Sequence, residues 1–254
     1  MSGALSFSRD FRRNNPGKRS FGVSKLRWAR FSSGVQHFAI PAHQIKITGM
    51  SSIAGFILAG GQSRRMGRDK WKLELDGRSF VDRIADEIKA VASSVAIVGD
   101  LVEDGLTTAA SRAKETTLKT VPDVFPQWGA LGGVHAALTH CDAEWALVVA
   151  CDFPFVTKEL FFRLASLRDN FEAVAPMQND QIPQPLCTLY RVEPCREVAE
   201  RMISSGERKP IALLQFVHTR WVSFSEVDDI AGSARFFENI NTPQDYERIL
   251  ERTR

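Results

Sequence analysis

Short apolar runs that alternate with amphipathic helices most strongly constrain the fold of this chain. Residues 53–58 and 145–150 are near-continuous apolar segments, too short to cross a bilayer and typical of strands buried on both faces. Between them, residues 80–91 place apolar side chains at helical spacing. Strands that alternate with helices pair in parallel through right-handed crossovers. The sequence therefore predicts an α/β protein, a three-layer α/β/α sandwich around a mostly parallel, Rossmann-like sheet.

The rest of the chain extends this alternation. Residues 95–98 and 119–121 are expected to form further strands. Residues 178–191 contain two prolines and no helical stripe, so we expect an antiparallel strand or hairpin there.

Capping residues indicate where the helices begin and end. Thr157 is expected to cap one helix, and Pro194 and Gly206 to begin and end another. The sequence from Thr242 to Asp245 resembles a capping box, which predicts that the last helix begins there.

Positive charge is concentrated at the start of the chain. Residues 1–50 contain nine Lys or Arg residues and one acid, Asp10, whereas the net charge of the whole chain is only +3. Such a segment is typical of a transit peptide, of a basic arm that binds nucleic acid, or of an unfolded extension, and Met50 is an alternative start. We expect a basic extension over residues 1–49 and a single, mildly acidic domain over residues 50–254.

The four cysteines indicate a reducing compartment. Cys141, Cys151, Cys187 and Cys195 form no CxxC pair, and their spacing suggests no metal site. No secretory signal precedes them, so the expected location is the cytoplasm. We expect a monomer or a weak oligomer that binds neither nucleic acid nor membranes.

A basic, glycine-rich loop follows the first apolar strand. Residues 59–70 contain Gly60, Gly61 and Gly67 together with four cations. Glycines let a backbone close around a ligand, and exposed N–H groups can cradle phosphates. The loop matches neither the Walker A motif nor the G-x-G-x-x-G fingerprint. A solvated basic loop would explain the charge, but not the three glycines.

A carboxylate, Asp152, follows the second buried strand. In an open parallel sheet it would lie at the same edge as the basic loop, where a carboxylate beside phosphates most often binds Mg²⁺. Asp123 and the glycine-rich residues 129–133 follow another strand. The residues themselves thus indicate a phosphate-rich nucleotide with a metal ion. They leave open hydrolysis or transfer, and guanine or cytosine.

Taken in order, these motifs resemble those of the molybdenum cofactor guanylyltransferases, the MobA family of nucleotidyltransferases. The resemblance covers residues 53–252. It rests on the segments 58–70, 122–123, 129–133, 151–154, 206–209 and 239–243. It implies a fold of the nucleotide-diphospho-sugar transferase type and transfer of GMP from GTP to molybdopterin, with release of pyrophosphate. Mg²⁺ is the implied cofactor, and molybdoenzymes or their chaperones are the implied protein partners.

The resemblance also implies roles for individual residues. Lys70, Arg65 and Asp152 would be catalytic, with Asp152 holding Mg²⁺. Asn239 and Asn241 would lie on the pterin side, with Arg208 and Lys209 near the pterin phosphate. The implied GTP-binding residues are Leu58, Ala59, Gly60, Gly61, Gly67, Lys70, Asp123, Gly133 and Asp152.

Two other functions fit parts of the sequence. A sister nucleotidyltransferase would share the basic loop but use CTP or a sugar or alcohol phosphate as acceptor. A non-catalytic nucleotide-binding module would act through residues 1–50 and release no pyrophosphate.

Overall fold

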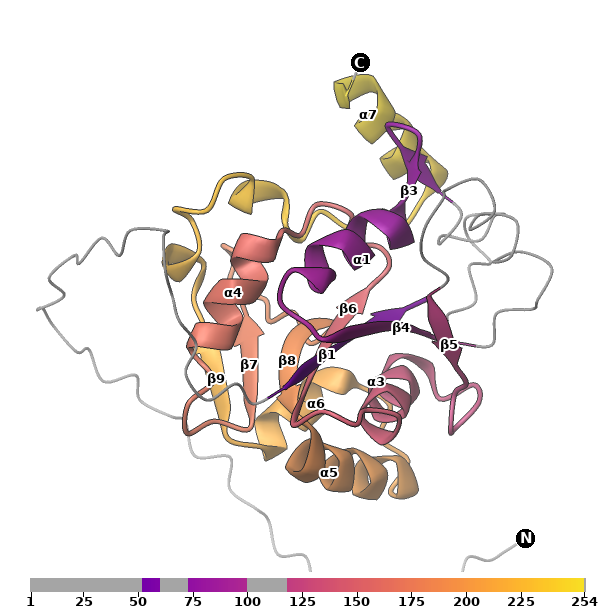
Figure 1. Ribbon diagram of the computed structural model, residues 1–254, viewed down its shortest axis with the longest axis vertical. Coiled ribbons are helices and arrows are strands. Elements are labelled where there is room, and N and C mark those ends of the chain that lie inside the picture. The colour runs from indigo at the N-terminus through magenta and orange to yellow at the C-terminus, as the bar shows by residue number, and fades with distance from the viewer. Residues whose placement is uncertain (1–51, 60–72, 100–117, 254) are drawn as a thin grey trace, which may run out of the picture. The chain divides into compact units, whose positions relative to one another are not determined.

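The computed structural model describes residues 52–59, 73–99 and 118–253 (Figure 1). These residues form a seven-stranded sheet in the order β5-β4-β1-β6-β8-β7-β9. β1 pairs in parallel with β4 and β6, β4 with β5, and β7 with β9, whereas β8 runs antiparallel to β6 and β7. In sheet order the strands are β5 (Lys119–Val121), β4 (Ser94–Val98), β1 (Ile53–Leu58), β6 (Trp145–Ala150), β8 (Cys187–Arg191), β7 (Ala173–Pro176) and β9 (Thr219–Val222). The predicted mostly parallel sheet is confirmed, as is the antiparallel strand within residues 178–191.

Helices cover both faces of this sheet (Figure 1). One face carries α1 (Phe80–Lys89) and α4 (Lys158–Ser166). The other carries α3 (Gly129–Thr139), α5 (Val192–Ser204) and α6 (Pro210–Phe216). This arrangement confirms the predicted three-layer α/β/α sandwich. No helix of the described part of the chain is long and apolar enough to cross a membrane.

The central strands are apolar throughout because both of their faces are buried. In β1, Ile53 and Ile57 pack in the cluster formed with α1 and α4. Ala54, Phe56 and Leu58 pack in the cluster formed with α3 and α5. Successive side chains of a strand point to opposite faces, so a six-residue apolar run fills both clusters.

The start of α4 corrects one prediction. Thr157 occupies the N-cap position, but its side chain makes no capping hydrogen bond within the described residues. Glu87 of α1 caps the helix instead, because its Oε2 accepts a hydrogen bond of 2.8 Å from the N–H of Lys158. The other predicted boundaries are confirmed: Pro194 lies in the first turn of α5, and Gly206 follows that helix at φ +89°.

A small hairpin packs against the C-terminal helix. β2 (Glu74–Leu75) and β3 (Arg78–Ser79) are joined by Asp76 and Gly77, whose φ values of 54° and 72° are typical of a type I′ turn. The helix α7 (Pro243–Thr253) begins with the predicted capping box, in which Thr242 and Asp245 exchange bonds of 2.9 and 3.1 Å. The hydroxyl of Tyr246 donates to the carbonyl of Glu74 at 2.6 Å, which fastens α7 to the hairpin.

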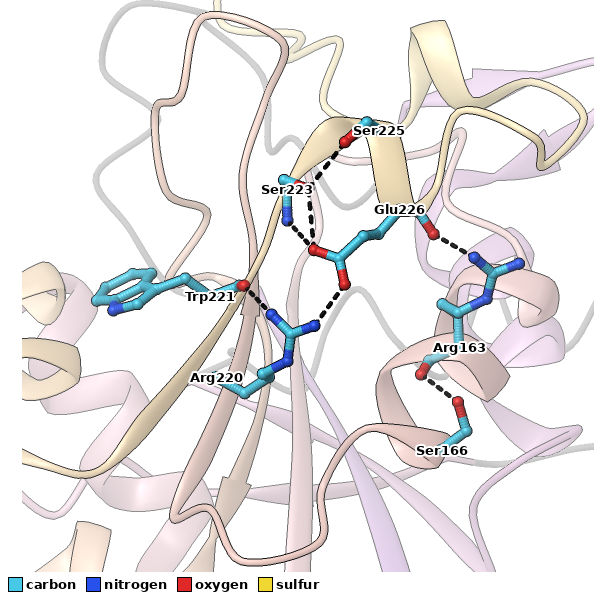
Figure 2. Close-up of polar contacts among 7 residues, drawn as sticks. All are labelled: Arg163, Ser166, Arg220, Trp221, Ser223, Ser225 and Glu226. Atoms are coloured by element: carbon cyan, nitrogen blue, oxygen red, sulfur yellow. Dashed lines mark hydrogen bonds and ion pairs between the residues drawn. The ribbon is translucent and has the colours of Figure 1, made fainter. Parts of the chain in front are cut away.

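The chain leaves the edge strand β9 through a polar cluster (Figure 2). Glu226 accepts hydrogen bonds from the N–H and the hydroxyl of Ser223, both at 2.9 Å, and pairs with Arg220. Burial alone would raise the pKa of Glu226, but the bonds from Ser223 and the charge of Arg220 outweigh it and hold the pKa below its ordinary value. Arg163 of α4 donates to the carbonyl of Glu226. The cluster therefore fixes the direction of the segment that follows β9.

Candidate active site

Three neighbouring strands end together at one edge of the sheet. The N–H of Cys151 donates to the carbonyl of Leu58 at 3.1 Å, and the N–H of Ala59 donates to that of Val98 at the same distance. The chain runs from β1 outward through β4 to β5 and then returns to β6 on the other side of β1. This reversal is a topological switch point, where open α/β sheets bind their ligands.

Asp152 lies in the turn that leaves β6 at this edge. Its neighbours Cys151 and Phe153 are buried, whereas Asp152 itself is half-buried. The N–H of Phe153 donates to the carbonyl of Ala150 at 3.3 Å, which closes the turn. The turn thus holds the carboxylate at the switch point, where the sequence had predicted it.

The start of α3 borders the same strand end. A β-carbon at Gly133 would lie 3.5 Å from either δ-methyl group of Leu58, so only a short side chain fits between them. Among the described residues no side chain caps this helix, and the N–H groups of a first turn attract anions and polar ligand edges. Asp123 lies two residues beyond β5 and is half-buried. Leu58, Ala59 and Gly133 are therefore close neighbours in the structure.

The segment from residue 239 to 241 lies directly against the Asp152 turn. The N–H of Ile240 donates to the carbonyl of Asp152 at 3.4 Å, although 88 positions separate the two residues in the sequence. Ile240 is buried, whereas Asn239 and Asn241 on either side of it are exposed. The structure thus brings together two motifs that the sequence could only place in order.

A second distant loop is fastened to the start of α3 through Trp128. The indole N–H of Trp128 donates to the carbonyl of Glu207 at 2.9 Å, and the guanidinium of Arg208 lies 4.4 Å from the centroid of the Trp128 ring. Arg208 also donates to the carbonyl of Gln127 at 3.0 Å. The N–H groups of Lys209 and Arg208 donate to the carboxylate of Glu207 and lower its pKa. Arg208 is thus held beside the start of α3, and its expected role near the pterin phosphate stays a prediction.

Several predicted site residues lie outside the described residues. They are Gly60, Gly61, Arg65, Gly67 and Lys70. Their expected roles stay predictions.

The described residues contain no group of three or more His, Cys, Asp or Glu side chains that could hold a metal ion by themselves. Mg²⁺ in nucleotide sites is usually held by one or two carboxylates together with substrate phosphates. A single carboxylate at the switch point, Asp152, fits this pattern.

Comparisons with known proteins decide the family. Residues 55–220 match the model of the MobA-like NTP transferase domain. The chain belongs to this family. Its members are nucleotidyltransferases, so the chain is an enzyme of this class, as its motifs had indicated.

Individual relatives agree with this family. A protein of Pelotomaculum thermopropionicum named "Probable molybdenum cofactor guanylyltransferase" is 34% identical over 198 residues, which is 77% of this chain and 91% of the relative. The crystal structure of molybdopterin-guanine dinucleotide biosynthesis protein A from Archaeoglobus fulgidus has a TM-score of 0.64 at 26% identity, over 78% of this chain and 97% of that protein. The resemblance to the molybdenum cofactor guanylyltransferases is therefore confirmed.

The fold alone is shared more widely. The crystal structure of 2-C-methyl-D-erythritol 4-phosphate cytidylyltransferase from Thermus thermophilus has a TM-score of 0.56 at 14% identity, over 77% of this chain and 96% of that protein. A fold of the nucleotide-diphospho-sugar transferase type is thus confirmed, while the base and the acceptor depend on side chains.

Proposed function

We propose that the chain transfers GMP from GTP to molybdopterin, forming the guanine dinucleotide cofactor and pyrophosphate. The observation that carries this proposal is the contact between Ile240 and the Asp152 turn. It joins the residues expected on the pterin side to the carboxylate expected beside the nucleotide phosphates, so donor and acceptor would meet at the switch point. The names of the family's relatives support the choice of substrates.

The nucleotide would bind across the ends of β1 and β6. Leu58, Ala59 and Gly133 are adjacent there, and Asp123 follows the neighbouring strand end. The N–H groups at the start of α3 would donate hydrogen bonds to a phosphate or to a base edge. The glycines Gly60, Gly61 and Gly67 are proposed, by family resemblance, to close around the triphosphate.

The proposed reaction is an in-line displacement at the α-phosphorus of GTP. An oxygen of the acceptor's terminal phosphate forms a bond to this phosphorus, and the bond to the bridging oxygen breaks, so pyrophosphate leaves with the electron pair. Such transfers depend on positioning and on charge neutralisation, so no protein nucleophile is needed. Lys70 and Arg65 would neutralise the triphosphate. Asp152 would hold Mg²⁺, which when bound offsets charge on the leaving pyrophosphate.

Asn239 and Asn241 would orient the acceptor. Their amides supply both donors and acceptors of hydrogen bonds, which suits the polar edge of a pterin. Arg208 and Lys209 would bind the acceptor's phosphate, since Trp128 holds Arg208 beside the start of α3.

The test is pyrophosphate release from GTP and Mg²⁺, with and without molybdopterin. Release that requires molybdopterin is expected, and faster release with CTP would overturn the guanylyl assignment.

Asp152→Asn should lower turnover about 100- to 1000-fold, by analogy with the loss of one charge-stabilising group. The matched control is Asp142→Asn, because Asp142 is exposed and precedes β6 at the opposite edge of the sheet. Parental turnover of Asp152→Asn would contradict the proposed site.

We further propose that residues 50–254 are the catalytic domain and that the protein is a cytoplasmic monomer or weak oligomer. The region shared with the Pelotomaculum relative covers 91% of that protein, which supports a domain of this size. All four cysteines are free thiols, as expected in a reducing compartment. A chain that starts at Met50 should therefore keep full turnover.

A further inference from the structure

An arginine stacks on the turn that carries Asp152. Arg235 ends the short helix η3 (Ser233–Arg235), and its guanidinium carbon lies 3.7 Å from the centroid of the Phe155 ring. Phe155 lies three residues beyond Asp152. A guanidinium over an aromatic face at this distance is attracted by the ring. The contact therefore joins the segment after β9 to the Asp152 turn.

The same arginine also contacts the residue before Asn239. The Nε of Arg235 donates to the Oε2 of Glu238 at 2.9 Å, and Arg252 of α7 donates to Oε1 of the same carboxylate at 3.0 Å. Glu238 immediately precedes Asn239 in the chain. One guanidinium thus holds Phe155 on one side and the start of the asparagine segment on the other.

Other contacts also join the two segments. The side chain of Ile240 is fully buried in a cluster with Phe80, and Phe155 packs against this cluster. The main-chain bond from Ile240 to Asp152 is long at 3.4 Å. The ring centroids of Phe153 and Phe237 lie 6.0 Å apart in an edge-to-face arrangement. Nη2 of Arg235 is buried and has no hydrogen-bond partner among the described residues. Burial of an unpaired donor destabilises a fold, so this nitrogen lowers the stability of the folded protein.

We propose that Arg235 is a positioning residue that holds Asn239 and Asn241 in register with the Asp152 turn. The proposal rests on the proposed function in one respect, that these asparagines bind the acceptor. Loss of the Arg235 contacts would then weaken acceptor binding and leave nucleotide binding intact, because Arg235 contacts Phe155 and Glu238, whereas Leu58 and Gly133 lie at the end of β1 and in α3.

The test compares Arg235→Met with Arg235→Lys. Methionine keeps an apolar stem over Phe155 but removes the charge, whereas lysine keeps a charge that can reach Glu238. Arg235→Met should raise the KM for molybdopterin about tenfold, the effect of losing one good contact, with the KM for GTP unchanged. Arg235→Lys should lie between that variant and the parent. The matched control is Arg252→Met, which removes the other partner of Glu238 but not the stack on Phe155.

Hydrogen exchange provides a readout that does not depend on the reaction. Exchange of the Ile240 amide should be faster in Arg235→Met than in the parent and Arg252→Met, while exchange in β1 stays unchanged. Unchanged exchange at Ile240, or equal changes in both KM values, would overturn the proposal and leave the buried side chain of Ile240 and the contact of Phe153 with Phe237 to hold the segment. A parent protein that releases no pyrophosphate from GTP with molybdopterin would instead overturn the proposed function, and the exchange data would still decide the role of Arg235.

Discussion

Gly55 lies in the middle of β1, where α1 crosses closest to the sheet. A β-carbon at this position would overlap Cγ2 of Ile88 and lie 3.5 Å from Cβ of Ile88 and from the carbonyl oxygen of Ser94. Ile88 is fully buried, and a β-branched side chain in a helix has one strongly preferred rotamer. The methyl group therefore cannot turn away, and α1 itself would have to move.

Gly55→Ala should lower the free energy of unfolding by about 1–3 kcal/mol, the usual cost of overpacking a core. Ile88→Leu moves the branch from Cβ to Cγ and so removes the methyl group that an alanine would meet. This variant should cost less than about 1.5 kcal/mol, because its volume is unchanged. The double variant should be more stable than the sum of the two effects predicts, by about 0.5–3 kcal/mol.

Urea unfolding at 25 °C, followed by tryptophan fluorescence, measures these differences, and equal m-values would show that the denatured state is unaffected. Ile84→Leu is the matched control, since Ile84 is also buried in α1, whereas the atoms nearest to a β-carbon at Gly55 belong to Ile88 and Ser94. Additive effects of Gly55→Ala and Ile88→Leu, or the same rescue by Ile84→Leu, would refute the steric argument.

Three further predictions concern the cap of α4, the glycines of α3 and one buried histidine. Glu87→Ala should destabilise the protein by about 0.5–2 kcal/mol in urea unfolding, because it removes the cap of α4, whereas Thr157→Val should cost nothing or stabilise it. Gly132→Ala should lower the melting temperature, because its β-carbon would lie 2.8 Å from Cβ of Trp128. Gly133→Ala should leave the melting temperature unchanged or raise it, because its β-carbon would lie 3.5 Å from the δ-methyl groups of Leu58. The reverse order would contradict the packing described for Leu58. Burial lowers the pKa of His135 below the ordinary 6.5, and Arg196 lowers it further while Glu200 opposes the shift. The unfolded chain therefore binds a proton more readily than the folded chain, so the free energy of unfolding should fall as the pH drops below about 6.5. His135→Gln should remove part of that fall in urea unfolding measured at several pH values. Equal pH profiles of the variant and the parent would show that His135 is not responsible.

The central fold was predictable because its signals are local. Residues 53–58 and 145–150 are short apolar runs typical of strands buried on both faces, and strands that pair in parallel end at the same edge of the sheet. Thr157 was assigned as a cap from its residue type, but the cap comes from Glu87, which lies 71 positions away from the N–H that it binds. The Asp76-Gly77 pair is a strong hairpin signal in the sequence, and the prediction missed it.

The candidate site was only partly predictable for a similar reason. Asp152 could be placed because it follows a strand end, and Asn239 and Asn241 because they match a family motif. The contacts of Trp128 with Arg208 and of Phe155 with Arg235 join residues 80 positions apart, and only the fold brings such pairs together. An aromatic residue just before a glycine-rich helix start, as at Trp128, was the one local signal available.

The segment between β9 and α7 joins the edge of the sheet to the turn that carries Asp152. It leaves the edge strand through Glu226, returns to the middle of the sheet beside Asp152, and lies beyond the matched family region, which ends at residue 220. Its buried side chains belong to the core: Phe236 lies in the cluster formed with α1 and α4, and Ile240 packs in a cluster with Phe80. If Asn239 and Asn241 bind the acceptor as proposed, a new acceptor would require changes at these exposed positions, while the buried apolar positions between β9 and α7 would have to stay apolar.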